Sequence, residues 1–206
     1  MKNILLIRHG QSEWNKLNLF TGFKNVDLSE LGVEEANKAG QNFKDIGLRF
    51  DIVYTSELKR AQDTAKIILQ NLDQWEQLNS NNKIIYNINL NERDYGDLTG
   101  LNKKETAEKF GDEQVHKWRR GYSDQPPNGE SLEDVVNRVK NYFDKEIINS
   151  INSDYNNNIL IAAHGNSLRA LLIVMNIYTP NEINSVELST GVPIHVIFSN
   201  NKFSLK

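Results

Sequence analysis

Short runs of apolar residues alternate along this chain with longer stretches in which apolar residues recur every three or four positions. The short runs predict strands at about 3–8, 51–55, 84–88, 158–163 and 192–198. The longer stretches predict helices near 29–47, 57–72, 131–150 and 166–177. Strands that alternate with helices are typical of a parallel sheet with helices on both faces. We therefore predict an α/β fold, with three α/β/α layers around a mostly parallel central sheet.

The helix at 131–150 has the most clearly marked start. Ser131 and Asp134 have the spacing of a capping box, in which each side chain bonds a backbone N–H of the other residue. Apolar residues then recur at helical spacing through Leu132, Val135, Val136, Val139, Tyr142 and Phe143. We expect this face to pack against the sheet.

The stretch 91–129 interrupts the alternation of strands and helices. It is polar, contains Lys103, Lys104, Arg119 and Arg120, and closes with Pro126-Pro127-Asn128-Gly129. A long connection of this kind commonly carries function. We predict a partly helical excursion that lies over the carboxyl ends of the strands as a lid or substrate-binding insert. The whole chain, 1–206, is then one domain.

The composition narrows the classes of partner. With a net charge of −3, the 206-residue chain has no general attraction to nucleic acid or to a membrane surface. Affinity for an anion must come from a local group of bases. The absence of cysteine removes thiol nucleophiles and thiolate metal sites. No apolar run has the length of an export signal or a membrane span, and we expect a cytoplasmic protein.

Two predicted strands lead directly into a histidine followed by a glycine. The first ends in Arg8-His9-Gly10 and the second in His164-Gly165-Asn166. The carboxyl ends of strands line the ligand crevice of open α/β sheets. A neutral histidine is a competent nucleophile toward phosphorus, and an adjacent guanidinium fits phosphate oxygens. A His-Gly pair at a strand end also fits a merely packed histidine, so this motif is weak alone.

Further polar residues follow in places that suit an anion. Arg60 falls on the first turn of the helix at 57–72, where the helix N-terminus favours anions, although an arginine there is commonly solvated. Glu92 opens the excursion and could act as general acid and base, or simply pair with Arg93. Hydroxyl, amide and backbone donors that suit an anion come from Ser12, Asn15, Thr21 and Gly22. Candidate contacts to the non-reacting part of an anionic substrate are Tyr95, Lys103, Arg119 and Arg120.

Metal binding is the rival explanation for two histidines at one crevice. The residues that flank His9 and His164 are arginine, glycine and amides, with no further histidine or carboxylate at ligand spacing. We therefore expect no metal, and we expect His164 to hold phosphoryl oxygens. We assign His116 to the surface and His195 to strand packing.

Taken together, these motifs resemble the histidine phosphatase superfamily, and within it the cofactor-dependent phosphoglycerate mutases. The 90–122 block discriminates best, because phosphatases of the superfamily generally keep the histidines but lack its lysine and paired arginines. The resemblance covers nearly the whole chain, in the blocks LIRHGQSEWN (6–15), FTGFKNVDLSELG (20–32), TSELKRAQDT (55–64), LNERDYGDLTGLNKKETAEKFGDEQVHKWRRGY (90–122), AAHGNSLRAL (162–171) and STGVPIHVIF (189–198).

The resemblance implies a role for each matching residue. His9 would accept the phosphoryl group, and Glu92 would donate and accept the proton. The transferring phosphate would be held by Arg8, Arg60 and His164, assisted by Ser12, Asn15 and Asn166. The substrate carboxylate and distal phosphate would be positioned by Thr21, Gly22, Tyr95, Lys103, Arg119 and Arg120. It also implies a small phosphorylated substrate, priming by 2,3-bisphosphoglycerate, no metal, and a monomer or homodimer.

Three functions remain open at this stage. The first is interconversion of 3-phosphoglycerate and 2-phosphoglycerate in glycolysis, favoured by the 90–122 block. The second is a phosphomonoester phosphatase that uses the same His9. It is favoured by the short Pro127-to-Ser131 junction and by how soon the chain ends after its last predicted strand. The third is a non-catalytic phosphate-binding protein, against which His9, Glu92, Arg60 and His164 argue together.

Overall fold

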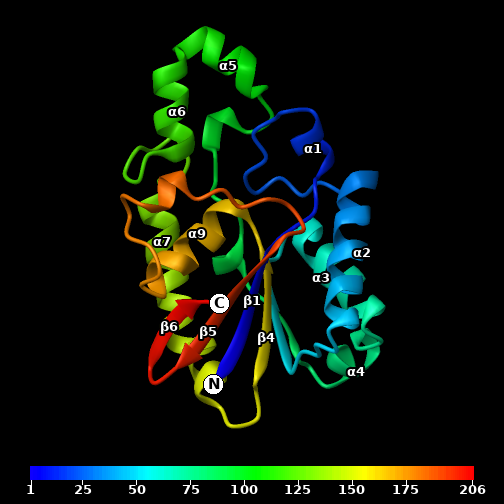
Figure 1. The fold of residues 1–206 in the computed structure, drawn as a ribbon. Coiled ribbons are helices and arrows are strands. Elements are labelled where there is room, and N and C mark those ends of the chain that lie inside the picture. The colour runs from blue at the N-terminus through cyan, green and yellow to red at the C-terminus, as the bar shows by residue number, and fades with distance from the viewer.

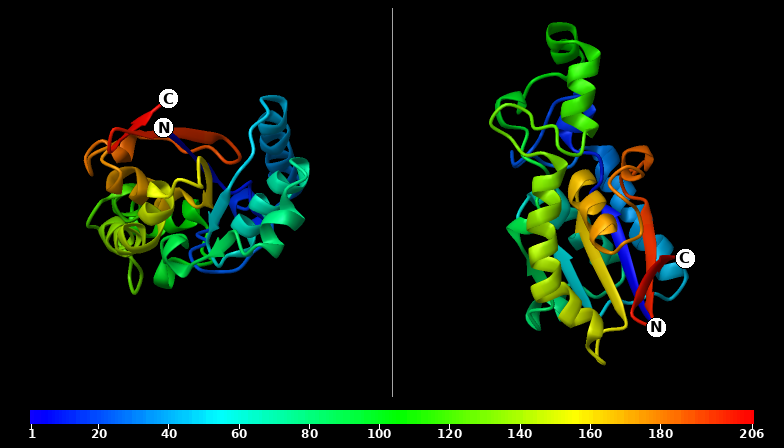
Figure 2. Two further views of the ribbon diagram at one scale, coloured as in Figure 1. Left: turned by 90° about the horizontal axis from the view of Figure 1, so that it is seen from below. Right: turned by 90° about the vertical axis from the view of Figure 1, so that its left-hand side faces the viewer.

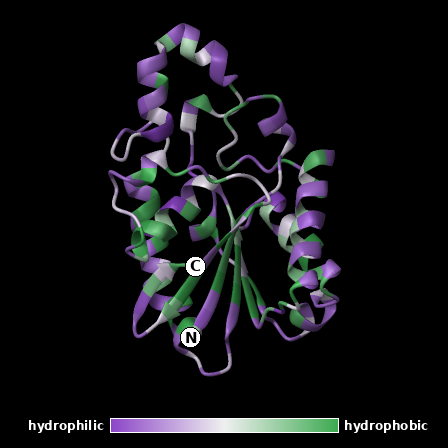
Figure 3. Ribbon diagram, viewed as in Figure 1, coloured by the Kyte–Doolittle hydropathy of each residue, from purple (hydrophilic) through white to green (hydrophobic).

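Alternate residues of the central strand enter two different hydrophobic layers. In the computed structural model, which describes residues 1–206, Ile4 and Leu6 pack into one buried cluster and Leu5 and Ile7 into another. A strand buried on both faces requires helices on both faces, because its side chains alternate between them. Figure 3 shows the resulting band of apolar residues along the strands.

The sheet has six strands in the order β3-β2-β4-β1-β5-β6. The first four in that order are parallel, while β5 runs antiparallel to β1 and β6 antiparallel to β5. This confirms the α/β fold with a mostly parallel central sheet. The strands are β1 (Lys2–Arg8), β2 (Ile52–Thr55), β3 (Ile84–Tyr86), β4 (Asn158–Ala163), β5 (Pro193–Ser199) and β6 (Lys202–Leu205).

Helices cover both faces of the sheet (Figures 1 and 2). One layer contains α2 (Glu30–Asp45) and α3 (Lys59–Asn71), followed by the short α4 (Trp75–Ser80). The other contains α7 (Leu132–Tyr142), α8 (Ile148–Asn152) and α9 (Gly165–Val174). The fold therefore has three layers, helices, sheet and helices, as predicted. None of these helices combines the length and apolar character needed to cross a membrane.

The predicted helix at 131–150 is interrupted. It begins as expected, with the reciprocal capping box of Ser131 and Asp134, but a π-helical turn, η3 (Phe143–Ile147), separates α7 from α8. In an uninterrupted helix the apolar face would drift around the axis beyond Phe143. The wider turn rotates Ile147 and Ile151 back onto the sheet, where both are fully buried. Local periodicity does not predict this correction.

The predictions also missed the second edge of the sheet. Strand β6 returns antiparallel to β5 through Asn200 and Asn201, which have φ of 52° and 57°. Asparagine tolerates this left-handed conformation, so the pair forms a tight hairpin. In β6 only Phe203 and Leu205 are apolar, which leaves too short a pattern to predict a strand.

The excursion at 91–129 rises above the carboxyl ends of the strands (Figures 1 and 2). It contains α5 (Lys103–Phe110) and α6 (Asp112–Arg120), and the short α1 (Glu13–Lys16) lies nearby. A small cluster of Phe20, Leu98 and Val115 gives this part its own buried contacts. The excursion is therefore packed in place over the strand ends rather than a loose loop.

A close contact between two glycines fixes helix α2 against the turn that follows β1. A Cβ on Gly32 would lie 2.0 Å from the Gln11 carbonyl oxygen, and one on Gly10 would lie 2.1 Å from the Gly32 oxygen. Neither contact is possible with a side chain present. The turn that carries His9 is thereby held by backbone on backbone.

We predict that Gly32→Ala lowers the free energy of unfolding by about 1–3 kcal/mol or more, although alanine is the better helix former. Urea unfolding would measure this loss. The control is Glu34→Ala on an exposed position of the same helix, which should unfold like the wild type. A Gly32→Ala protein of unchanged stability would show that the turn can move away at no cost.

Candidate active site

The two predicted histidines lie side by side because their strands are neighbours. Strands β1 and β4 pair in parallel with Arg8 opposite Ala163, so His9 and His164 follow at the same edge of the sheet. The His9 N–H donates to the Ala163 carbonyl at 3.0 Å. The ring centroids are 4.9 Å apart at an interplanar angle of 59°. Sheet register thus brings together two motifs that are far apart in sequence.

The tautomer of His9 follows from its hydrogen bond to the backbone. Nδ1 lies 2.7 Å from the Gly10 carbonyl oxygen, and a carbonyl can only accept, so we assign the hydrogen to Nδ1. The lone pair is then on Nε2, which lies 3.4 Å from Nε of Arg60. Burial, followed by the positive charges of Arg60 and Arg8, holds the pKa of His9 well below 6.5. His9 is therefore a neutral base whose unprotonated Nε2 accepts only the long hydrogen bond from Arg60.

His164 is fully buried behind this first ring. Its Nε2 lies 2.7 Å from Oγ of Ser56, a residue not identified from the sequence. The same hydroxyl accepts the Leu58 N–H at 3.1 Å, so its own hydrogen is free to donate to Nε2. Burial, followed by the positive charge of Arg60, lowers the pKa of His164 well below 6.5. Nδ1 has no partner in the protein.

Arg60 is buried, contrary to the common behaviour of an arginine on a first helical turn. Only 1% of it is exposed. Its terminal nitrogens donate to the carbonyls of Gly22 and Lys24, both at 2.9 Å. Burial lowers the pKa of Arg60 to about 10, which still leaves it charged at neutral pH. Gly22 thus contributes a carbonyl that orients this guanidinium beside His9.

Glu92 is a buried carboxylate held by backbone and amide donors. Its Oε1 accepts from the Arg93 N–H at 2.8 Å and from the Asn166 N–H and Nδ2 at 3.1 and 3.0 Å. Burial by itself would raise the pKa of Glu92. Hydrogen bonds and nearby charge outweigh burial, so the pKa lies below its ordinary value; the groups responsible are the Arg93 N–H, Arg8, Asn166 and Arg60.

The simple pairing of Glu92 with the Arg93 side chain does not occur. The guanidinium of Arg93 instead donates to the Arg119 carbonyl at 2.6 Å, at the end of α6, and lies over the ring of Tyr95. Arg93 is fully buried, with two of its nitrogens unpartnered. It links the segment that carries Glu92 to the helix that carries the paired arginines.

Arg138 of α7 fixes the backbone that carries Glu92. Its guanidinium donates to the carbonyls of Asn89, Asn91 and Glu92 and forms an ion pair with Glu130 at 2.8 Å. Glu130 also accepts the N–H of Asp94. Glu130 belongs to the short junction before Ser131. The junction therefore packs directly against the segment that carries Glu92.

A cavity of about 170 Å³ opens above these residues. All the predicted site residues line it except Ser12, Gly22 and His164. Ser12 is used locally, where its side chain and that of Asn15 cap α1 reciprocally. The lining residues are Arg8, His9, Asn15, Leu19, Thr21, Arg60, Glu92, Tyr95, Lys103, Arg119, Arg120, Gly165, Asn166, Arg169, Glu187 and Leu188.

Cations are concentrated on the excursion side of this cavity. Lys103 begins α5, and Arg119 and Arg120 end α6. Burial, with the charges of Arg119, Arg8 and Arg120, lowers the pKa of Lys103 to about 8, against the opposing effect of Glu92. These positive charges repel one another, so an anion that entered would relieve the repulsion.

Five of the lining residues were not among the predicted site residues: Leu19, Gly165, Arg169, Glu187 and Leu188. Arg169 of α9 is 7% exposed, and Glu187 and Leu188 lie in the connection between α9 and β5. Arg169 had an available signal, since it follows Gly165 by four residues and so lies on the same face of the helix. Glu187 and Leu188 had none, because their place depends on how an irregular segment crosses the strand ends.

The groups around the histidines are mainly guanidinium, amide and hydroxyl groups, with the Glu92 carboxylate. No three His, Cys, Asp or Glu side chains are grouped so that they could hold a metal ion. The remaining histidines are elsewhere: His116 is exposed on α6, and the His195 ring in β5 hydrogen-bonds Asn3 at 2.9 Å.

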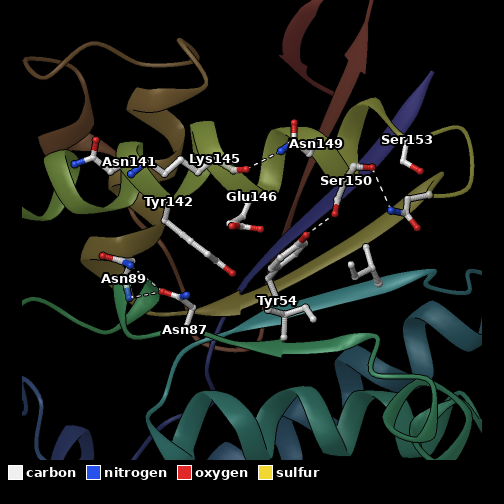
Figure 4. A pocket seen from close by; sticks show the side chains of 13 residues that line it. Tyr54, Asn87, Asn89, Asn141, Tyr142, Lys145, Glu146, Asn149, Ser150 and Ser153 are labelled. Carbon is white, nitrogen blue, oxygen red and sulfur yellow. Dashed lines mark hydrogen bonds between the residues drawn. The ribbon is translucent and has the colours of Figure 1, made fainter.

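A second cleft, of about 610 Å³, lies between strand β3 and the α7–η3–α8 segment. Figure 4 shows Tyr54 rising from β2 toward Ser150, and Tyr142 extending from α7 on the opposite side of the cleft. Its lining contains one lysine and no arginine or histidine. It therefore has little of the positive charge that favours a phosphate, whereas the cavity at His9 is lined by several cations.

Comparison with known proteins shows the family to which this chain belongs. The family model of the histidine phosphatase superfamily (branch 1) matches residues 4–206, and the chain belongs to this superfamily. Its fold is shared by the α-ribazole phosphatase of Shigella flexneri, with a TM-score of 0.77 and 24% identity over 99% of this chain and 94% of that one.

Closer relatives are mutases. The 2,3-bisphosphoglycerate-dependent phosphoglycerate mutase of Methylocella silvestris is 52% identical over 191 residues, which are 93% of this chain and 89% of that protein. The protein of the same name from Parvibaculum lavamentivorans is 51% identical over 195 residues, or 94% of this chain and 90% of its own. These relatives are similar to this chain in length.

The buried neutral histidines predict a loss of stability in acid. The pKa values of His9 and His164 are far lower in the folded protein than in the unfolded chain, where they titrate near 6.5. Below pH 6.5 the unfolded state therefore binds more protons. Each histidine should then reduce the free energy of unfolding by up to about 1.4 kcal/mol per pH unit. Urea unfolding between pH 8 and pH 5 would measure this slope.

Substitution identifies the groups responsible. His9→Gln should reduce the acid slope, while His116→Gln at the exposed site should leave it unchanged. Equal slopes in all three proteins would mean that His9 is protonated in the folded state and is not the neutral base described above.

Proposed function

We propose that this enzyme interconverts 3-phosphoglycerate and 2-phosphoglycerate through a phosphohistidine at His9. One observation carries the proposal: a single cavity is lined by His9 and Glu92 and also, from helices α5 and α6, by Lys103, Arg119 and Arg120. A phosphoryl-transfer centre needs only the first two residues. The added cations suit a substrate that carries another anionic group.

In the first half of the reaction, the enzyme carries a phosphoryl group on Nε2 of His9. The free hydroxyl of 3-phosphoglycerate attacks this phosphorus, and the bond between Nε2 and phosphorus breaks. Glu92, which is ionised because its pKa is lowered, takes the hydroxyl proton. The products are 2,3-bisphosphoglycerate, neutral His9 and protonated Glu92.

The second half returns the proton. After the bisphosphorylated intermediate reorients, Nε2 of His9 attacks the phosphorus of the 3-phosphate. The 3-oxygen leaves with the proton held by Glu92, which gives 2-phosphoglycerate and regenerates the phosphohistidine. Arg8 and Arg60 offset the charge on the transferring oxygens, and His164 is proposed to assist from Nδ1, which has no protein partner. Bound 2,3-bisphosphoglycerate would supply the first phosphoryl group.

The remainder of the substrate would be held by Asn15, Thr21, Lys103, Arg119 and Arg120. The hydroxyl of Thr21 and Nε of Arg8 are both buried, and neither has a hydrogen-bond partner in the protein. Such donors favour an anionic ligand, because buried polar groups are ordinarily hydrogen-bonded. Ser12 would act through Asn15, and Gly22 through Arg60. Tyr95 would act with Asn166, whose Nδ2 lies 3.4 Å from its hydroxyl.

This function places the enzyme in glycolysis and gluconeogenesis, and hence in the cytoplasm, as an isomerase that needs no metal. The oligomeric state, monomer or homodimer, stays a prediction. The phosphatase alternative was favoured by the short junction, but that junction serves to place Glu130 against Arg138 and Asp94. The names of relatives at about half identity favour the mutase.

A product assay tests the proposal. Wild-type protein given 3-phosphoglycerate and a trace of 2,3-bisphosphoglycerate should produce 2-phosphoglycerate, with little inorganic phosphate. His9→Ala should produce neither, and only the wild type should carry acid-labile phosphate. Release of inorganic phosphate as the main product would instead establish the phosphatase. Because burial keeps His9 neutral, phosphorylation of the enzyme should persist below pH 6.5.

Mutation should separate substrate binding by the cations of the excursion from phosphoryl transfer at His9. Arg119→Gln with Arg120→Gln should raise the KM for 3-phosphoglycerate by roughly tenfold or more, since charge-assisted hydrogen bonds are worth about 1.5–3 kcal/mol each. Formation of phosphohistidine should fall much less. Rapid-quench measurement of the phosphoenzyme beside steady-state assays would compare the two effects. Equal losses in both would contradict a distal role.

A further inference from the structure

Arg169 is the one buried cation at the cavity that the proposed reaction does not use. It lies on α9, one turn after Gly165, and its guanidinium spans two backbone carbonyls. One terminal nitrogen donates to Gly165 at 3.3 Å and the other to Val186 at 3.0 Å. Its Nε is buried without a partner. Burial of a guanidinium nitrogen without an acceptor is unfavourable, so the position of Arg169 calls for a functional explanation.

The carbonyl of Val186 belongs to a segment that forms one wall of the cavity. We call residues 186–190 the wall segment. Leu188 is 4% exposed and lines the cavity together with Glu187. The wall segment continues past Thr190, which bridges to Arg8, into β5. It contains no helix or strand of its own, so side chains from other elements must hold it.

Two arginines hold the wall segment on either side of Glu187. Arg169 donates to Val186, and NH1 of Arg8 donates to the Leu188 carbonyl at 2.9 Å. Arg8 is the residue placed beside His9 to meet the transferring phosphoryl group. The position of the wall therefore also determines the direction of the Arg8 guanidinium. Arg169 is connected to the reacting centre through this segment.

Three charged groups, those of Arg169, Glu92 and Arg8, surround Gly165. A Cβ at Gly165 would lie 3.3 Å from Arg169 NH1, 3.7 Å from Glu92 Oε2 and 3.8 Å from Arg8 Nε. Arg169 is thus close to both the base and the phosphate-binding arginine. Burial lowers the pKa of Arg169 to about 10, so it stays charged at neutral pH. A displaced wall would expose this group of residues to water.

We propose that Arg169 is a positioning residue that closes the wall segment over the phosphohistidine and so determines how the phosphoenzyme divides between transfer and hydrolysis. The inference rests on the proposed function and deepens it. With the wall held, the phosphoryl group passes to the substrate hydroxyl. With the wall released, water attacks the same phosphorus, the bond to Nε2 breaks, and inorganic phosphate leaves.

Two substitutions separate the charge of Arg169 from its geometry. Arg169→Lys keeps the positive charge but cannot span both carbonyls, whereas Arg169→Gln loses the charge as well. The matched control is Arg49→Gln, because Arg49 also donates to a carbonyl, that of Leu72, at a site that does not line the cavity. Circular dichroism and urea unfolding would establish that each variant folds.

The primary measurement is the ratio of phosphate released to 2-phosphoglycerate formed. Both Arg169 variants should raise this ratio by roughly tenfold, since a small misplacement far from the reacting atoms can cost about 10²-fold in rate. Arg49→Gln should match the wild type. A merely structural role would lower both products together and leave the ratio unchanged, and that result would overturn the proposal.

Hydrogen–deuterium exchange gives a second readout that needs no substrate. The wall segment should exchange faster in Arg169→Lys than in the wild type, while α7 should not change. Wild-type exchange there, or a wild-type product ratio in Arg169→Lys, would overturn the proposal. If the wild type forms no phosphohistidine, the proposed function fails, and the exchange measurement still decides whether Arg169 anchors the wall.

Discussion

The structure depends on the burial of several guanidinium groups at one edge of the sheet. Each must exchange water for other oxygen acceptors, and most of those acceptors are backbone carbonyls of irregular segments. Arg60 takes the carbonyls of Gly22 and Lys24, and Arg169 takes those of Gly165 and Val186. The buried arginines need these carbonyls as hydrogen-bond acceptors, and the same hydrogen bonds therefore hold the loops in place. Burial, together with the positive charge that results, keeps the histidines neutral, and hydrogen bonds with the same positive charge keep Glu92 ionised.

In the proposed reaction, two sets of residues in one cavity have different tasks. His9 carries the phosphoryl group, and Glu92 takes up a proton that it later returns. Lys103 and the paired arginines favour a second anionic group. A phosphatase needs only the first set and admits water. A mutase must retain a bisphosphorylated intermediate, so its chemistry depends on the walls of the cavity as much as on the nucleophile.

Sequence patterns predicted the elements where local and tertiary requirements agree. The capping box at Ser131 and the apolar stripe after it are local, and α7 starts where they indicate. The prediction failed at η3, where packing of Ile147 on the sheet overrides the helical repeat. It also missed β6, which exists because a strand already stands beside it. In both cases the deciding contact is with residues far away in the chain.

The sequence by itself determined which chemical groups are available: two histidines at strand ends, the arginine beside the first, a carboxylate, and the cations of the excursion. Only the tertiary structure decided how they act. Sheet register sets His9 against His164, a backbone carbonyl selects the tautomer of His9, and burial sets the pKa values. The wall segment also emerges only there. The reason is physical: desolvation and hydrogen-bond geometry depend on neighbours in space, which local sequence does not contain.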